Sequence, residues 1–418
     1  MRSLGVGLLM CAVTAFAQEE WDDWGDEWED GAGLQWSGFV EGALGERLSS
    51  DPLLPDSTLR DARMRLETEW SGDALRLTFK GEALYDGHLE EFEGELRDLS
   101  LAASPGESLD VRVGRQVLTW GTGDLLFLND LFPKSWVSFF AGRDDEYLKA
   151  PSDAVRATWY TDAINADFVW IPEFEPDDYL TGERFSFFSP VAGAIVAPKP
   201  PLSARAPDRG ELAMRLFRNF GSTEFALYLY DGYFKRPIAL DANMEPAFAP
   251  LAVFGASARR PISKGLLNAE VAYYVSRDDR AGTAPGIPND QARFLVGYDF
   301  EAVTNLNVGL QYYLEWTQDH DALLQNSPDP RFEPEEYRHV LTNRITYRTL
   351  QDKLVWSLFT FYSPTERDYY MRPVLTYRYS DRWSYSGGVN LFGGQRDHTF
   401  FGQLEDNSNA YLRVRFNY

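Results

Sequence analysis

The chain ends on Ala410-Tyr-Leu-Arg-Val-Arg-Phe-Asn-Tyr418, a stretch in which apolar and polar side chains alternate without a break. Successive side chains of a β-strand point to opposite faces, so one face of this stretch is entirely apolar or aromatic. The other face carries a tyrosine, two arginines and an asparagine. A strand with one face in lipid and the other in water has this pattern. The stretch therefore predicts a strand of a membrane β-barrel.

The same stretch resembles the C-terminal signal by which β-barrels of Gram-negative outer membranes are recognised for assembly. That signal has a final aromatic residue preceded by apolar residues at alternate positions, which here are Leu412, Val414, Phe416 and Tyr418. The resemblance implies that the protein lies in the cell outer membrane. It also implies two kinds of partner: the barrel assembly machinery, and the outer-membrane lipid with its lipopolysaccharide.

The other end of the chain has the features of a secretory signal peptide. Arg2 precedes the apolar run 4–16, and Ala15-Phe-Ala17 supplies the small residues of a cleavage site. We expect residues 1–17 to be removed on export. Cleavage there also removes Cys11, the single cysteine of the chain, and so excludes a disulfide framework.

Composition agrees with an exported barrel. Aromatic residues make up 15% of the chain, yet no stretch after residue 17 approaches the roughly 20 consecutive apolar residues of a transmembrane helix. A barrel strand needs only about 9–11 residues, of which every second one is apolar. The formal net charge of −24 argues against nucleic-acid binding, because phosphate neutralisation requires clustered basic residues.

Residues 18–33 form an acidic, tryptophan-rich segment. From Gln18 to Asp30 the chain contains three tryptophans and has neither helical nor strand periodicity. We predict a flexible periplasmic tail. It is either a solvated leader, a docking peptide for a periplasmic partner, or an acidic plug for a basic lumen.

Eighteen segments with period-two alternation follow the tail, and an even number is usual for bacterial single-chain barrels. They are Leu34–Arg47, Leu59–Trp70, Leu75–Tyr85, Glu95–Ala103, Leu109–Thr119, Val155–Tyr160, Ile164–Trp170, Glu211–Phe217, Thr223–Tyr230, Val253–Arg259, Leu266–Val275, Ala292–Phe300, Asn305–Trp316, Val340–Arg348, Leu354–Tyr362, Tyr370–Tyr379, Trp383–Leu391 and Ala410–Tyr418.

The connections between these segments are alternately short and long, as expected for a barrel with both termini in the periplasm. The sequence thus predicts an all-β fold, a transmembrane antiparallel up-and-down β-barrel of about 18 strands, over residues 34–418. A barrel this wide is not filled by its own side chains. The long connections lie near residues 48–58, 86–94, 120–153, 171–210, 231–251, 277–291, 317–338, 363–369 and 392–409.

The third long connection, residues 120–153, is the best candidate for a constriction. It is partly apolar and contains a charged stretch. We expect it to fold back into the lumen, which buries its apolar side and presents its charges to the pore; the alternative is a lid over the barrel mouth. The charges expected at the constriction are those of Arg143, Asp144, Asp145, Glu146 and Lys149.

Three stretches around this connection resemble the alginate-export type of porin and related outer-membrane porin-like proteins. They are Val113-Gly-Arg-Gln-Val-Leu-Thr-Trp-Gly121, Asn129-Asp-Leu-Phe-Pro133 and the stretch from Glu146 to Trp159. The resemblance covers about the middle third of the chain. It implies an eighteen-stranded pore with a folded-in third loop.

Basic residues recur on the strand face expected to line the lumen. Rings of arginine select anions in pores, and planar guanidinium groups suit carboxylate or phosphate. We expect Arg112 and Arg156, whose strands flank the third loop, to lie opposite its acidic stretch. Acidic residues share the same face, so the alternative is a lumen of mixed charge. The basic residues expected along the solute path are Arg63, Arg65, Arg76, Lys80, Arg112, Arg156, Arg215, Arg344, Arg348, Arg372, Arg378, Arg413 and Arg415.

Aromatic residues fall into two groups by strand parity. Those that face outward near strand ends, such as Trp70 and Trp170, fit interfacial girdles. A second group has lumen parity and either forms a stacking track for a polymer or fills space near the wall. These residues are Tyr228, Tyr230, Tyr274, Tyr313 and Tyr411.

Signals for enzymatic chemistry are weak. The four histidines, His88, His320, His339 and His398, are not spaced as metal ligands, and no nucleophile elbow, phosphate loop or dinucleotide fingerprint is present. We expect no catalytic residues, no metal site and no cofactor.

The sequence therefore favours a passive outer-membrane channel for diffusion or export of a polar, anionic solute or polymer. One alternative is an outer-membrane partner of an inner-membrane pump that moves a hydrophobic molecule and is engaged through the tail. Another is a barrel with a structural role. All three need the same wall, so strand parity does not separate them.

Overall fold

A computed structural model describes residues 35–418. The expected signal peptide (1–17) and acidic tail (18–33) lie outside the described residues. Within residues 35–418 no helix is long and apolar enough to cross a membrane.

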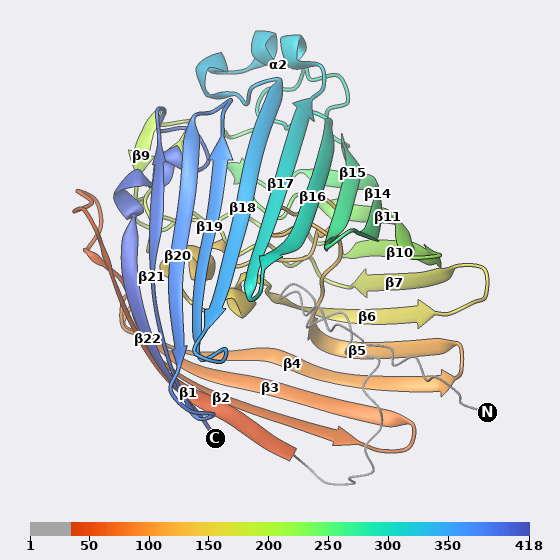
Figure 1. Ribbon diagram of the computed structural model, residues 1–418. Helices are drawn as coiled ribbons and strands as arrows, with labels where there is room; N and C mark the ends of the chain where they lie inside the picture. The colour runs from red at the N-terminus through yellow and green to blue at the C-terminus, as the bar shows by residue number, and fades with distance from the viewer. Residues whose placement is uncertain (1–34) are drawn as a thin grey trace, which may run out of the picture. The chain divides into compact units, whose positions relative to one another are not determined.

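Eighteen strands form one antiparallel sheet that closes on itself (Figure 1). Each strand pairs with the next along the chain, and β22 pairs with β1 from Phe39↔Asn417 to Arg47↔Asn409. The strands are β1 (Gln35–Arg47), β2 (Ser57–Ser71), β3 (Leu75–Asp86), β4 (Glu91–Gly106), β5 (Leu109–Val117), β6 (Pro151–Trp159), β7 (Asn165–Ile171), β10 (Glu211–Phe220), β11 (Thr223–Tyr233), β14 (Pro250–Ile262), β15 (Gly265–Ser276), β16 (Gln291–Val303), β17 (Leu306–Thr317), β18 (Tyr337–Thr349), β19 (Leu354–Ser363), β20 (Asp368–Arg378), β21 (Trp383–Gly394) and β22 (Asn409–Asn417).

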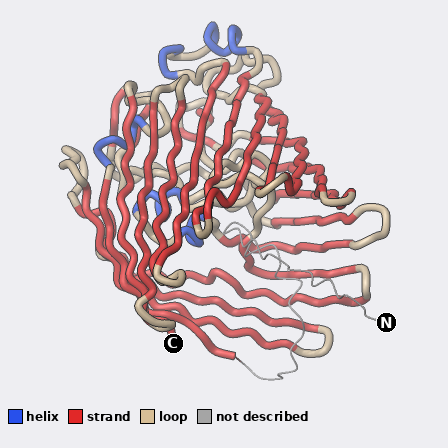
Figure 2. Tube along the Cα trace, in the orientation of Figure 1, coloured by secondary structure: helices blue, strands red, loops and turns tan. Residues whose placement is uncertain are grey.

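The remaining described elements lie in the connections, and Figure 2 shows that the helices are separate from the strands of the wall. All of these connections start from the same end of the barrel, which we call the loop end; the opposite end is the turn end. These elements are α1 (Trp136–Ala141), η1 (Asp145–Leu148), the hairpins β8 (Phe187–Ser189) with β9 (Ala194–Val196) and β12 (Ala239–Leu240) with β13 (Pro246–Ala247), α2 (His320–Asn326), η2 (Pro330–Phe332) and η3 (Gly402–Asn407).

The predicted fold is confirmed, since each of the eighteen predicted segments coincides with one strand of the sheet. The prediction of long connections near 86–94 and 363–369 is wrong. The hydrogen-bonded ladders continue to Asp86↔Glu91 and Ser363↔Asp368, which leaves only tight turns at 87–90 and 364–367. Strand pairing thus extends further toward the loop end than hydrophobic alternation shows.

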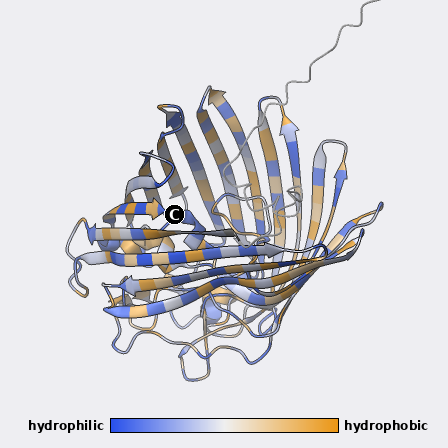
Figure 3. Ribbon diagram, turned by 90° about the horizontal axis from the view of Figure 1, so that it is seen from below, coloured by the Kyte–Doolittle hydropathy of each residue, from blue (hydrophilic) through white to orange (hydrophobic). Residues whose placement is uncertain are grey.

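Side chains on the outer face of the wall are apolar and exposed. Leu44, Leu310 and Leu412 are 66%, 51% and 69% exposed, respectively. In Figure 3 hydrophilic and hydrophobic residues alternate along the strands, which is the pattern of a wall between lipid and water. An exposed apolar surface on a closed barrel is the lipid-facing band of a membrane protein.

The buried core lies inside the barrel, between the wall and the connections. The five tyrosines of lumen parity are all buried, with exposed fractions of 6% or less. Tyr274 Oη, for example, donates a hydrogen bond to the carbonyl of Leu128, which belongs to the connection between β5 and β6. Tyr228 lies 6.1 Å from Trp120 of the same connection, so at least these two tyrosines pack against a connection that enters the lumen.

Candidate pore constriction

The connection between β5 and β6, residues 118–150, is called the third loop below. Its first half is bound to β15 through Glu270, whose carboxylate is 2% exposed. Glu270 accepts hydrogen bonds from the N–H of Gly123 (2.8 Å) and of Thr122 and from Asn129 Nδ2 (2.7 Å). Gly121, with φ of +86°, turns the chain so that these donors converge on one carboxylate.

Asp124 makes a second attachment, to β17 and β18. Its carboxylate accepts a hydrogen bond from Arg344 Nη2 at 2.9 Å. The amide of Gln311, oriented to satisfy both groups, donates to the Asp124 carbonyl at 2.9 Å and accepts from the Asp124 N–H at 2.8 Å. Main chain and side chain of one residue are therefore held by two strands.

The middle of the third loop is the short helix α1. Ser135 caps it by accepting from the N–H of Ser138 at 3.2 Å. The carbonyl of Phe140 accepts hydrogen bonds from Asn390 Nδ2 (2.9 Å) and Asn409 Nδ2 (3.0 Å), which lie on β21 and β22. The end of α1 is thereby fixed to β21 and β22, on the side of the barrel opposite Glu270.

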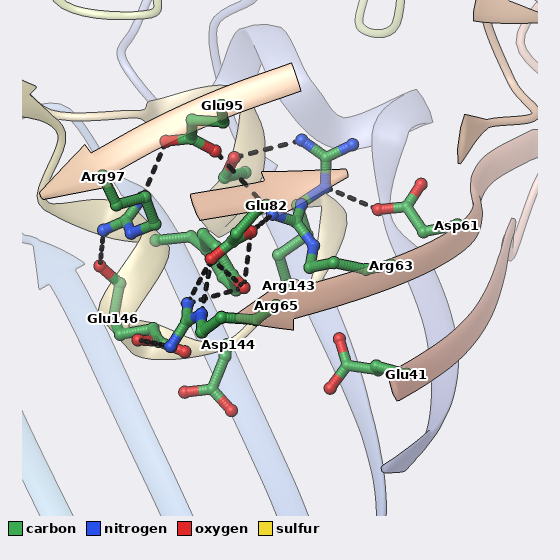
Figure 4. Close-up of polar contacts among 12 residues, drawn as sticks. Glu41, Asp61, Arg63, Arg65, Glu82, Glu95, Arg97, Arg143, Asp144 and Glu146 are labelled. Atoms are coloured by element: carbon green, nitrogen blue, oxygen red, sulfur yellow. Dashed lines mark hydrogen bonds and ion pairs between the residues drawn. The ribbon is translucent and has the colours of Figure 1, made fainter. Parts of the chain in front are cut away.

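The charged stretch follows α1 and binds the wall residue by residue. Arg143 donates to Asp61 on β2 at 2.7 Å (Figure 4). It also donates to Asp86 on β3 at 2.9 Å. The three acidic residues each pair with a wall arginine: Asp144 with Arg413 (2.9 Å) and Arg415 (3.3 Å), Asp145 with Arg372, and Glu146 with Arg65 (2.8 Å).

Tyr147 completes this cluster beneath the loop. Its hydroxyl donates to Glu82 on β3 (3.1 Å) and accepts from Arg65 Nη2 (2.8 Å). The guanidinium groups of Arg63 and Arg97 lie 4.1 and 4.8 Å from the centre of its ring. Cation–π contacts and charge-assisted hydrogen bonds together hold η1 against β2–β4.

These contacts place the third loop inside the barrel, because it touches β2, β3, β15, β18, β20 and β22, which lie on different sides of the closed wall. Water nevertheless reaches its acidic stretch: the side chains of Asp145, Asp144 and Glu146 are 52%, 34% and 29% exposed. Burial raises the pKa of Asp144, but the charges of Arg413 and Arg415 outweigh it and hold that pKa below its ordinary value. The loop acids are therefore charged groups beside water inside the wall.

Five of the basic residues expected along the path form ion pairs with acids of the third loop, namely Arg65, Arg344, Arg372, Arg413 and Arg415. The guanidinium groups of Arg65 and Arg372 lie behind the loop acids, with side chains only 4% exposed. Carboxylates rather than arginines are thus the more accessible charges at this point. Lys149 contributes its carbonyl, which accepts from Arg97 Nη2 at 2.9 Å.

The expected position of Arg112 and Arg156 opposite the loop acids is wrong. Arg112 pairs with Asp98 (2.6 Å) and Arg156 with Asp167 (2.8 Å), both on neighbouring strands. Arg112 is three residues from the start of β5 at the turn end, whereas the third loop enters from the loop end. Strand parity predicted the correct face but not the height along the barrel.

The other predicted lumen residues also lie on the inner face, away from the loop acids. Several have partners on adjacent strands: Arg63 with Glu82, Arg76 with Glu69 (3.3 Å), Lys80 with Glu67 (3.7 Å) and Arg215 with Glu224 (2.8 Å). Near the turn end, Arg348 lies opposite Val355, and Arg378 lies opposite Ser384.

Arg97 is a functional candidate that parity missed. Leu99 and Leu101 of β4 are exposed on the lipid face, and strict alternation along the strand would place Arg97 on that face too. A register shift between Lys80 and Gly81 opposite β4 reverses the alternation, and Arg97 is 4% exposed, on the inside. A β-bulge leaves no clear signal in a single sequence.

Comparison with known proteins shows similarity of fold. No protein-family model and no curated protein matches the chain. The structure of OccAB4 of Acinetobacter baumannii is 12% identical, with a TM-score of 0.56, over 92% of this chain and 98% of that one. OccAB3 of the same organism is 9% identical, with a TM-score of 0.54, over 93% and 99%. OccK2 of Pseudomonas aeruginosa, solved in complex with glucuronate, is 8% identical, with a TM-score of 0.54, over 92% and 97%.

At these identities the likeness shows the fold alone, that of a porin-like β-barrel. Within residues 35–418 no group of three or more histidine, cysteine or acidic side chains is placed to hold a metal ion.

Proposed function

We propose that the protein is a passive outer-membrane channel whose passage is narrowed by the third loop. The observation that carries the proposal is the Asp145 side chain, which is paired with the buried Arg372 yet is 52% exposed inside a closed wall. Water that reaches this pair occupies space between loop and wall, and a barrel of eighteen strands is wide enough to hold an aqueous passage. Closed barrels with an apolar outer band lie in bacterial outer membranes, with long loops outside.

For the solute we propose a polar, anionic molecule. The wall arginines on β2, β18, β20 and β22 supply positive charge along the passage. The resemblance to alginate-export porins and the glucuronate of the OccK2 complex both suggest an acidic sugar or its polymer. The loop acids oppose this preference, so net selectivity depends on the balance between the two sets of charges.

Conductance in planar bilayers tests the proposal. Purified protein is expected to give ohmic single-channel currents, with a reversal potential in a salt gradient that indicates anion preference. Cation preference would contradict the proposal of an anionic solute but would still support the channel function. Current that appears only after removal of residues 18–33 would favour a pump partner, and no current in either form would favour a structural barrel.

A further inference from the structure

A cluster of aromatic side chains joins the third loop to the wall at the loop end. Its buried part includes Phe140, Phe392 and Tyr370, all 2% exposed or less. The Phe140 and Phe392 rings lie 5.2 Å apart, edge to face. Burial and ring geometry assign these residues to packing.

The same cluster has an edge that is not covered. Phe127 and Trp136 of the third loop and Phe400 of the connection 395–408 are all partly exposed. Trp136 lies 6.1 Å from Phe127 and 6.0 Å from Phe400, edge to face in both cases. Three rings from two loops thus form a continuous aromatic surface at the mouth of the lumen.

Arg236 faces this surface from the connection 234–249, which joins β11 and β14. Its guanidinium carbon lies 5.2 Å from the centre of the Phe400 ring. Among residues 35–418, no carboxylate is within ion-pair distance of Arg236. The nearby Asp177 is already occupied, because it accepts from the Lys134 N–H (2.8 Å) and from Trp136 Nε1 (2.9 Å).

The surroundings of Arg236 increase its need for an anion. Burial and the neighbouring charges of Arg293 and Arg338 lower the pKa of Arg236, against the opposing charges of Asp177 and Glu315. Each of these two arginines has its own acid: Arg293 lies 3.4 Å from Glu315, and Arg338 lies 2.7 Å from Glu366. Within the described part of the chain, Arg236 is therefore the one guanidinium of these three that has no carboxylate at ion-pair distance.

We propose that Arg236 and the rings of Phe400, Trp136 and Phe127 form an entry site for a ring-bearing carboxylic acid. The guanidinium binds the carboxylate, for which its planar donors are suited, while the solute ring covers the exposed aromatic edge. The inference rests on the proposed channel function and names the class of solute that the channel admits. The site is built from three connections at the loop end. A solute bound there would be held before it reaches the constriction at the third loop.

Equilibrium binding to the folded protein in detergent micelles tests the site, with glucuronate, benzoate, glucose and acetate as probes. Glucuronate or benzoate is expected to bind more tightly than glucose, which lacks the acid, and than acetate, which lacks the ring. The better of the two acids identifies the ring as a sugar or an aromatic one. Arg236→Gln is expected to weaken that binding roughly tenfold or more, because a charge-assisted hydrogen bond is lost.

Two further variants keep the test independent of folding defects. Phe400→Leu, which retains Arg236, is expected to weaken binding about fivefold by removing one ring face. Arg396→Gln is the matched control: Arg396 lies in the same connection as Phe400 but is paired with Glu335 (3.1 Å), so its loss should not change affinity. Heat-modifiable gel migration confirms that each variant is folded.

Equal affinity of wild type and Arg236→Gln, or acetate binding as tightly as the ring acids, would overturn the entry site. The same protein preparation is tested for conductance. If the wild type conducts but its affinity for glucuronate and benzoate does not change in Arg236→Gln, the entry site is wrong and the channel function stands. Arg236-dependent binding by a barrel that never conducts upholds the site and overturns the channel.

Discussion

Glu270 shows how a single buried carboxylate fixes the shape of a lumen. It receives hydrogen bonds from two main-chain N–H groups and from Asn129, and no water is needed to satisfy it. Glu270 lies on the inner face of β15, and its partners lie about 150 residues away in the third loop. The closed packing of the first half of that loop depends on this residue.

We predict that Glu270→Gln loosens the third loop without unfolding the barrel. An amide has one acceptor where the carboxylate has two, and it turns a donor toward existing donors, at a cost of about 1–3 kcal/mol. The expected results are noisier single-channel currents and faster proteolysis within residues 118–131. Glu224→Gln serves as the control, since Glu224 pairs with Arg215 and does not touch the loop. Identical current noise in both variants would contradict the anchoring role.

The charges of the third loop make a second prediction at the residue scale. Replacing Asp144 and Asp145 with Ser removes two negative charges from the third loop and leaves Arg372 without its acid, while Arg413 and Arg415 keep Glu41 as a partner. The reversal potential should therefore shift toward anions and conductance should rise. Effects should shrink at 1 M salt, where the screening length falls to about 3 Å.

The Arg112→Ser and Arg156→Ser double variant is the comparison. These arginines pair with Asp98 and Asp167 near the turn end and should change selectivity much less. A larger shift from this pair than from the loop acids would place the constriction near the turn end.

At the scale of elements, alternation in the sequence was enough to identify every strand of the sheet and the lipid face of the wall. It did not identify ion-pair partners, because parity specifies a face while partner choice depends on height along the barrel and on the path of a loop. Asp145 and Arg372 are 227 residues apart and meet only in the folded molecule. Arg97 was misplaced for a more local reason, the bulge opposite it.

The seam between β22 and β1 carries a prediction of its own. Tyr418 donates from its main-chain N–H to the Gly38 carbonyl (3.0 Å) and from its hydroxyl to the Arg65 carbonyl (2.7 Å). Its ring covers Gly38, where a Cβ would lie only 2.9 Å from a ring carbon. Tyr418→Asp should stop barrel assembly by placing a charge on the lipid side of the seam, whereas Tyr418→Phe should assemble. Normal heat-modifiable migration of the Asp variant would refute this.

The faces of β17 give a further prediction about the element. Leu310 is 51% exposed on the outer face, so Leu310→Arg should destabilise the barrel by roughly 2–4 kcal/mol if the site lies near the bilayer midplane. Asn307→Arg, on the inner face, should be tolerated. Gln311 does not serve as a second inner control, because it is buried against Asp124. Equal stability of the two variants in guanidinium unfolding from liposomes would mean that the register assigned to β17 is wrong there.

At the scale of the whole molecule, the wall and the third loop have different roles: the wall forms the barrel and the loop narrows its lumen. The closed sheet requires only alternation of apolar and polar side chains, and it forms a wide cylinder. The third loop, residues 118–150, narrows the lumen of this cylinder by binding β15, β18, β20, β22 and β2 in turn. Attachment on several sides means that the passage is set by the loop rather than by the strands. A channel of this kind is tuned by changes in one segment without loss of the fold.

Thiol modification of Asp145→Cys during single-channel recording tests the central claim most directly. The described residues contain no other cysteine, and position 145 is expected to border the aqueous passage. A charged, membrane-impermeant thiol reagent should reduce the current through Asp145→Cys stepwise and leave Leu310→Cys, on the lipid face, unchanged. Steady current through Asp145→Cys after complete labelling of the thiol would contradict a passage beside the third loop.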